Sequence, residues 1–198
     1  MKTQIKPMRQ GACDRLCGAY AVLNAVSALS PDMTVSDKNI LFQAMLHGIA
    51  SKRQLSIDHL WAGLNGDDID FLLDLAGGFL KRRYEYLTHH RLRRRRSASV
   101  SEVFSRLRES MDKSSVAILR VELLDSKHWT VAYKVGKHRI RLLDSAGLGD
   151  LTRDRCSLKR DNFKTRLLPS YFRIVQMVDD EPEPSSSASP PLADKSAS

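Results

Sequence analysis

Residues 10–29 read QGACDRLCGAYAVLNAVSAL, and the second half of this stretch decides the fold. From Cys17 to Leu29 nearly every side chain is apolar or small, which predicts a helix that is buried on almost every side. A cysteine at the first position of a helix lies where unpaired backbone N–H groups and the helix dipole favour a thiolate. The stretch therefore predicts a nucleophilic thiol at the start of a buried helix.

A lone cysteine is more often a small buried core residue than a nucleophile, and that is the main alternative for Cys17. Gly18, which leaves room for a substrate carbonyl, and Gln10, which can join the Cys17 backbone N–H as an oxyanion donor, favour the nucleophile. Cys13 does not precede a helix and is predicted to be structural. Cys156 lies in a basic loop without a predicted catalytic role. Because a CxxxC pair without a second pair is a weak zinc signature, neither a metal nor an organic cofactor is predicted.

Residues 128–135 read HWTVAYKV, an alternating pattern that predicts a strand with His128 at its beginning. His128 can thus meet a thiol on a packed helix and act as its base. The residues predicted to face the core are Trp129, Val131, Tyr133 and Val135. The histidines predicted to have no catalytic role are His47, His59, His89, His90 and His138.

The third member of the site depends on the hairpin that follows this strand. Asp144 ends the next strand and can accept the Nδ1–H of His128. If two residues form the turn, Ser145 lies opposite His128 and Asp144 faces away; if three form it, Asp144 lies directly opposite His128. Asp125 and Ser145 are the fallback partners of His128, and a turn cap is the alternative role of Asp144.

The order of elements predicts an α+β fold. A helical part covers about residues 17–112, and an antiparallel sheet covers about 115–178. The predicted helices are 17–29, 36–50 with Ser36 as its cap, 67–80 and 101–111. The predicted strands are 116–123, 129–135, 139–144 and 171–178.

The composition is that of a globular protein with uneven charge. The 198 residues include 32 Lys and Arg against 23 Asp and Glu. No apolar run reaches the roughly 18 residues of a membrane span, three cysteines are too few for a disulfide framework, and no signal-peptide core is present, so a cytoplasmic protein is expected. Residues 1–178 carry 31 basic and 18 acidic side chains, whereas residues 179–198 carry five acidic side chains and one lysine. This tail, rich in Pro and Ser, is predicted to be disordered, which leaves 1–178 as the folded domain.

These motifs together resemble the papain-like cysteine peptidases, and among them compact bacterial members similar to the bacteriocin-processing peptidase domains. The resemblance covers about residues 5–178 in order and layout. It implies that Cys17 is the nucleophile, His128 the general base, Asp144 the residue that orients it, and Gln10 the oxyanion-hole glutamine. It also implies cleavage of a peptide or isopeptide bond through a thioester, without a cofactor. Two features depart from the family: Gln10 is one residue further from the cysteine than usual, and Tyr20 follows Cys17-Gly18-Ala19 where a tryptophan directly after the cysteine is familiar.

Two other kinds of function stay open. An acyltransferase or deamidase of the same fold would use the same triad. A nucleic-acid or acidic-partner binding protein with an inactive site is favoured by the net charge of +13 on residues 1–178 and by one arginine run, although no nucleic-acid motif accompanies that run. The run consists of Arg91, Arg93, Arg94, Arg95 and Arg96.

Overall fold

The computed structural model describes residues 6–10, 15–53, 63–83, 85–92, 99–123 and 126–178. The predictions for Cys13, His59, Asp125, 93–96 and the tail 179–198 therefore lie outside the described residues.

The described elements are helices in the first half of the chain and mostly strands in the second. The helices are α1 (Cys17–Leu29), α2 (Val35–Arg53), α4 (Gly66–Lys81) and α5 (Val100–Ser110). The strands are β1 (Tyr86–Arg91), β2 (Ser115–Leu123), β3 (Ser126–Val135), β4 (Arg139–Leu143), β5 (Asp150–Thr152), β6 (Cys156–Ser157), β7 (Thr165–Leu167) and β8 (Arg173–Val178). Short 3₁₀ helices cover Arg153–Arg155 and Pro169–Tyr171. Within the described residues, no helix combines the length and apolar character that crossing a bilayer requires.

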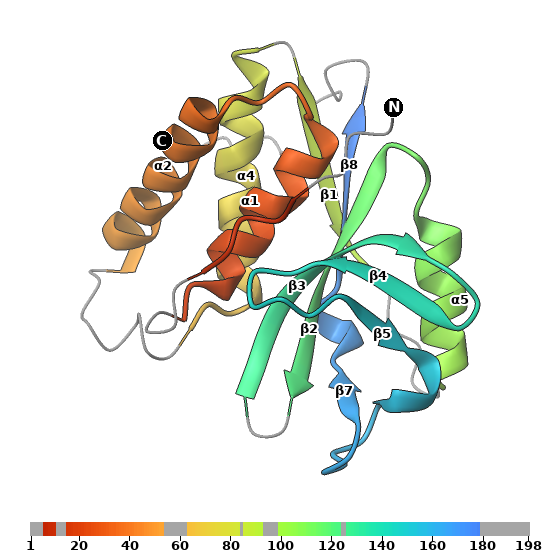
Figure 1. Cartoon of the computed structure of the whole chain (residues 1–198). Helices are drawn as coiled ribbons and strands as arrows, with labels where there is room; N and C mark the ends of the chain where they lie inside the picture. The colour runs from red at the N-terminus through yellow and green to blue at the C-terminus, as the bar shows by residue number, and fades with distance from the viewer. Residues whose placement is uncertain are drawn as a thin grey trace, which may run out of the picture.

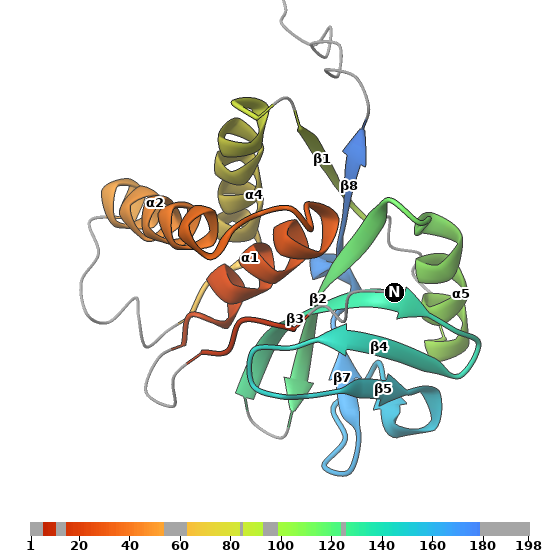
Figure 2. The same cartoon turned by 45° about the horizontal axis from the view of Figure 1, so that its top comes forward.

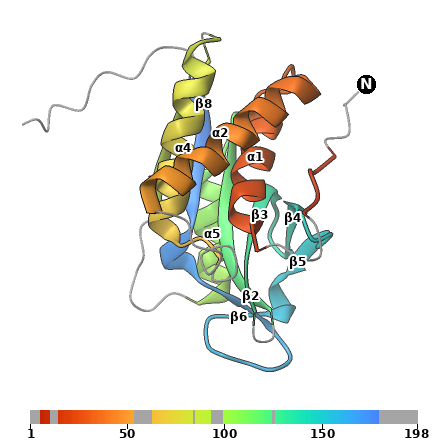
Figure 3. The ribbon, with the colours of Figure 1, turned by 90° about the vertical axis from the view of Figure 1, so that its left-hand side faces the viewer.

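The strands form one sheet in the order β1-β8-β2-β3-β4-β5, with β7 beside β2 and β6 beside β7. Every pairing is antiparallel except β6 with β7. Helices α1, α2 and α4 lie on one side of this sheet and α5 lies on the other, as the two views in Figure 1 and Figure 2 show. Figure 3, seen from the side of α2, has α2 and α4 in front of the strands. The fold is therefore α+β, as the sequence predicts.

Two hydrophobic cores fill the two faces of the sheet. Helices α1, α2 and α4 share one core with Ile118 of β2 and with Trp129 and Val131 of β3. Helix α5 packs on the opposite face, where Leu119 and Ala132 come from the same two strands. Because neighbouring residues of β2 and β3 go to different cores, the sheet is buried on both faces, and the alternation along these strands fixes their register.

The predicted helices are present, and α1 has the predicted bounds because its residues are apolar all round. The prediction that Ser36 caps the second helix is wrong. Thr34 caps α2, since its Oγ1 accepts from the Asp37 N–H at 3.1 Å while the Asp37 carboxylate accepts from the Thr34 N–H at 2.9 Å.

Strand β1 is absent from the prediction, and charged groups on α4 hold it in place. Arg173 of the neighbouring strand β8 is 1% exposed; its Nε donates to Asp70 of α4, and its Nη2 donates to Asp70 at 3.0 Å and to the Gly66 carbonyl at 3.1 Å. Arg91 of β1 donates to the same Asp70 at 2.6 Å and to Asp67 at 2.9 Å. Arg91, the first residue of the arginine run, is therefore part of the contact between α4 and the sheet.

This arrangement makes Asp70 a test of the packing between α4 and the sheet. We expect Asp70→Ala to lower the free energy of unfolding by about 3 kcal/mol or more, because the buried Arg173 loses its counter-charge. The matched control is Asp74→Ala. The Asp74 side chain contacts His89 at 2.9 Å but is 73% exposed, so its removal should lower the free energy of unfolding by under about 1 kcal/mol. Urea unfolding of both variants measures the difference, and equal losses would contradict this account.

Candidate active site

Cys17 is the first residue of α1 and is 7% exposed. No side chain caps this helix: the residue at the cap position is Leu16. The first-turn N–H groups of α1 are therefore not used by a capping side chain, and they lie where they can stabilise a negative charge on the sulfur or on a bound carbonyl. Gly18 is closely packed: a Cβ there would lie 2.9 Å from Ile69 Cδ1 and 3.0 Å from Leu64 Cδ1, so both side chains would have to shift.

Two sets of contacts fix the segment that carries Gln10, one to the middle of α1 and one to the turn after β4. The Asn24 side chain of α1 accepts from the Met8 N–H at 2.7 Å and donates to the Met8 carbonyl at 3.2 Å. The Gln10 N–H donates to the Ser145 carbonyl at 3.3 Å, and the Ser145 hydroxyl donates to Gln10 Oε1 at 2.9 Å. With Oε1 turned toward Ser145, the carboxamide nitrogen points the other way. Ser145 therefore orients the Gln10 carboxamide.

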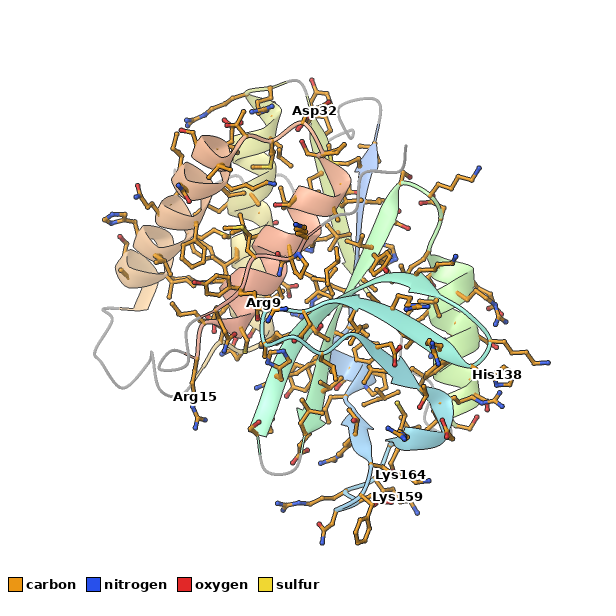
Figure 4. All side chains as sticks on the ribbon, in the orientation of Figure 1. Arg9, Arg15, Asp32, His138, Lys159 and Lys164 are labelled. Carbon is orange, nitrogen blue, oxygen red and sulfur yellow. The ribbon has the colours of Figure 1, made fainter. Side chains whose placement is uncertain are left out.

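The segment before Gln10 also packs over the turn that follows β4. Arg9 lies there, with its Nη1 3.5 Å from the position that a Cβ on Gly147 would take. Figure 4 shows Arg9 in front of the sheet near α1. Gly147 has a φ of +95°, a backbone conformation that favours glycine.

His128 and Asp144 form a buried pair. His128 Nε2 lies 2.6 Å from Asp144 Oδ2, with the two side chains 9% and 0% exposed. The other oxygen, Asp144 Oδ1, accepts from the backbone N–H groups of Ala146 and Leu148, both at 2.9 Å. Asp144 therefore orients the imidazole and caps a turn at the same time. Cys17 lies close to the same imidazole, since its sulfur is among the groups that raise the pKa of His128.

The imidazole ring of His128 has the opposite orientation to the predicted one. Asp144 was expected to accept from Nδ1, but the structure places Nε2 of His128 against the carboxylate. Nδ1 is therefore the nitrogen left for the Cys17 thiol. Ser145, a fallback partner for His128, bonds Gln10 instead.

A β-bulge brings Asp144 to the face of His128. Val135 pairs with Ile140 at the turn end of the hairpin, and the register shifts by one residue between Ala132 and Lys134. Beyond the shift, Ala132 pairs with Leu142. Extending this register by two residues puts Asp144 opposite Thr130, which lies two residues from His128 and on the same face. Without the extra residue, Asp144 would fall on the other face.

Both predicted hairpin registers are consequently wrong, and so is part of the predicted core face. The turn residues are Lys137 and His138, since the Gly136 N–H donates to the Arg139 carbonyl at 2.8 Å. The bulged residue Tyr133 was expected in the core and is 42% exposed.

The surroundings of His128 favour its protonated form. Burial lowers its pKa, but the hydrogen bonds with Asp144 and Cys17 and the charges of these groups outweigh burial and raise the pKa of His128 from 6.5 to about 9. Burial raises the pKa of Asp144. The hydrogen bond with His128, the charge of His128 and the hydrogen bond from the Leu148 N–H lower it, and together they outweigh burial, so the pKa of Asp144 is lowered. The pair is therefore an imidazolium beside a carboxylate at neutral pH.

The remaining cysteine and histidines of the described chain stand apart from this arrangement. Cys156 lies buried in β6, where burial and the charge of Asp154 raise the pKa of its thiol to about 11. His89 contacts Asp74 of α4 at 2.9 Å, and His138 is exposed in the β3–β4 turn. No cluster of three or more His, Cys, Asp or Glu side chains within the described ranges could hold a metal ion.

Sequence reasoning missed Asn24, and it named Ser145 only as a fallback partner of His128, not as the partner of Gln10. Asn24 is 2% exposed in an otherwise apolar helix, and a buried amide in such a helix was the available signal for Asn24. Ser145 is 3% exposed, and nothing in the sequence relates it to Gln10, which is 135 residues away.

We expect Ser145→Ala to lower kcat about ten-fold while KM changes little. Loss of the hydroxyl removes one contact that orients the Gln10 carboxamide, and an oxyanion donor acts in the transition state. Steady-state kinetics of Ser145→Ala and Gln10→Ala measure this. The double variant should lose no more than Gln10→Ala alone, because Ser145 acts through Gln10; additive losses would contradict that role.

The pH dependence of kcat/KM should report the raised pKa of His128. Since the folded-state pKa lies above 6.5, the imidazolium persists through neutral pH, and we expect activity to fall as the pH rises through about 9. Asp144→Asn removes the carboxylate charge, so the fall in activity at high pH should move to a lower pH. Asp154→Asn, at an exposed carboxylate in a 3₁₀ helix, is the charge-matched control. If the fall in activity stays at the same pH in Asp144→Asn, the pairing of Asp144 with His128 would be contradicted.

Comparisons with known proteins add one distant likeness. No family model matches the chain, and no curated protein matches it. Among solved structures the chain is similar to the avirulence protein AvrPphB of Pseudomonas, with 8% sequence identity, a TM-score of 0.38, and coverage of 81% of this chain and 89% of that chain. A likeness this distant carries no argument about activity, so the function proposed for the chain rests on its own geometry.

Proposed function

We propose that this chain is a papain-like cysteine peptidase that cleaves a peptide or isopeptide bond of a protein substrate. The observation that carries the proposal is the buried pair of His128 and Asp144, 2.6 Å apart, beside Cys17 at the start of a helix. A nucleophile, a base and an orienting group in this order are what acyl transfer requires.

In the first half of the reaction, the Cys17 sulfur attacks the substrate carbonyl carbon and a carbon–sulfur bond forms. The developing oxyanion accepts from the Cys17 backbone N–H and from the Gln10 carboxamide. As the carbon–nitrogen bond breaks, the His128 imidazolium gives its proton to the leaving amine, and the acyl group remains as a thioester.

In the second half, His128 is neutral and takes a proton from water. The resulting nucleophile attacks the thioester, the carbon–sulfur bond breaks, and the carboxylic acid leaves. Asp144 keeps one ring nitrogen directed at the sulfur throughout, because its other oxygen is fixed by two backbone N–H groups.

A peptide library read by mass spectrometry tests this proposal. The full chain is incubated with a tryptic digest of a bacterial proteome, and new peptide ends are identified. New ends that depend on Cys17 support a peptidase. Intact peptides with glutamine converted to glutamate would identify a deamidase, and intact peptides with an added amine would identify a transferase. Either result without new ends would overturn peptidase activity.

A further inference from the structure

The Arg120 side chain of β2 is held between two aromatic rings. Its guanidinium carbon lies 5.1 Å from the ring centroid of Trp129 and 4.6 Å from that of Tyr171. These two rings stand nearly perpendicular, at 83°. Arg120 is half-buried, so its flexible side chain is restricted before any ligand binds.

Arg120 nevertheless has no counter-charge in the described part of the chain. Its Nε is buried without a hydrogen-bond partner. Glu122, two residues along on the same face of β2, accepts from Arg166 at 2.9 Å and is thereby already paired. A guanidinium that is restricted in this way and has no acceptor suits an anionic ligand, because its planar N–H groups can donate two parallel hydrogen bonds to a carboxylate.

A continuous set of contacts connects this guanidinium to the thiol. Arg120 pairs across the sheet with Trp129, the residue that follows His128. The Trp129 indole N–H donates to the Leu64 carbonyl at 2.9 Å, and Leu64 packs against Gly18, next to the nucleophile. Trp129 and Cys17 belong to one core, so Arg120 lies on the same side of the sheet as α1. Because an extended peptide advances about 3.3 Å per residue, an acidic side chain that meets Arg120 would belong to a residue a few positions from the cleaved bond.

Positive charge also borders the start of α1. Arg9 immediately precedes Gln10, and Arg15 lies two residues before Cys17; both are exposed, and Figure 4 shows them near the beginning of α1. Neither forms an ion pair with a residue that the structure describes. A positive border of this kind attracts acidic ligands.

We infer that Arg120 recognises an acidic side chain, Asp or Glu, within a few residues of the bond that is cleaved. The inference rests on the proposed peptidase function and adds the class of substrate to it. Arg120 is a specificity-determining residue in this account, and the arginines beside α1 raise the rate of encounter with acidic segments.

The same peptide library tests the inference. Cleavage by the native chain should be enriched in Asp or Glu at one position near the new ends, and Arg120→Gln should abolish that enrichment. For a single Glu-containing peptide from the library, Arg120→Gln should lower kcat/KM about ten-fold or more, whereas the peptide with Gln at that position should be affected little. Arg82→Gln, at an exposed arginine that ends α4, is the matched control for the lost charge. If Arg120→Gln does not fold, Arg120→Lys keeps the charge without the planar fork and should weaken the preference.

Binding separates this inference from the proposed function. Fluorescein-labelled octapeptides with one Glu at successive positions, and their Gln counterparts, are titrated into the Cys17→Ala variant by fluorescence anisotropy. Tighter binding of a Glu peptide that Arg120→Gln removes would support the inference even if no cleavage is found. No acidic preference in cleavage or binding, or a preference that Arg120→Gln retains, would overturn it.

Discussion

Replacing Cys17 with alanine is expected to lower kcat by roughly ten-thousand-fold or more, because the variant has no atom that can form the thioester. The fold should survive, since alanine fits a site that is already buried among small residues of α1. Hydrolysis of a peptide identified from the library measures the loss, and the melting temperature measures the fold.

The other two cysteines provide controls for that variant. Cys156→Ala and Cys13→Ala should retain most activity, since Cys156 is buried in β6 and Cys13 is predicted from the sequence to be structural. If Cys13→Ala were inactive and Cys17→Ala active, the nucleophile would be wrongly placed, and the role of Gln10 would fail with it.

Replacing His128 with glutamine is the second variant with a very large expected effect, roughly a thousand-fold loss in kcat or more. The glutamine amide can still donate to Asp144, so the buried carboxylate keeps a partner, but it cannot carry a proton between the thiol and the leaving amine. Kinetics on the same peptide measure the effect, and circular dichroism verifies the fold.

His138→Gln is the matched control for this substitution. His138 is exposed in the β3–β4 turn, and its replacement should leave kcat unchanged within about two-fold. Full activity of His128→Gln would show that another group carries the proton, and the proposed mechanism would be wrong.

The elements predicted best from the sequence are those whose pattern of apolar and polar side chains fits only one kind of element. Residues 17–29 are apolar all round and form α1 with the predicted bounds. The strand that begins near His128 was predicted from its alternation, although the structure begins it at Ser126. Cys17, His128 and Asp144 were each selected from local context; the structure pairs His128 with Asp144 and has Cys17 among the groups that raise the pKa of His128.

The features that the sequence did not predict depend on tertiary contacts. Strand β1 reads YLTHHR, which lacks apolar alternation, and it pairs with β8 while Arg91 binds carboxylates of α4. The bulge at Tyr133 also has no local signal, because HWTVAYKV alternates as if no residue were extra. That bulge determines the face on which Asp144 lies, so sequence alone left the third member of the site open.

The rate of cysteine alkylation by iodoacetamide tests the central claim most directly, because it measures the reactivity of the Cys17 thiol without requiring a substrate. The native chain and His128→Gln are treated at pH 6, and the modified cysteines are mapped by mass spectrometry over time. Cys17 of the native chain should react roughly ten-fold faster or more than Cys156, and this advantage should be lost in His128→Gln. Equal rates at Cys17 and Cys156, or a fast Cys17 that His128→Gln leaves unchanged, would contradict the account.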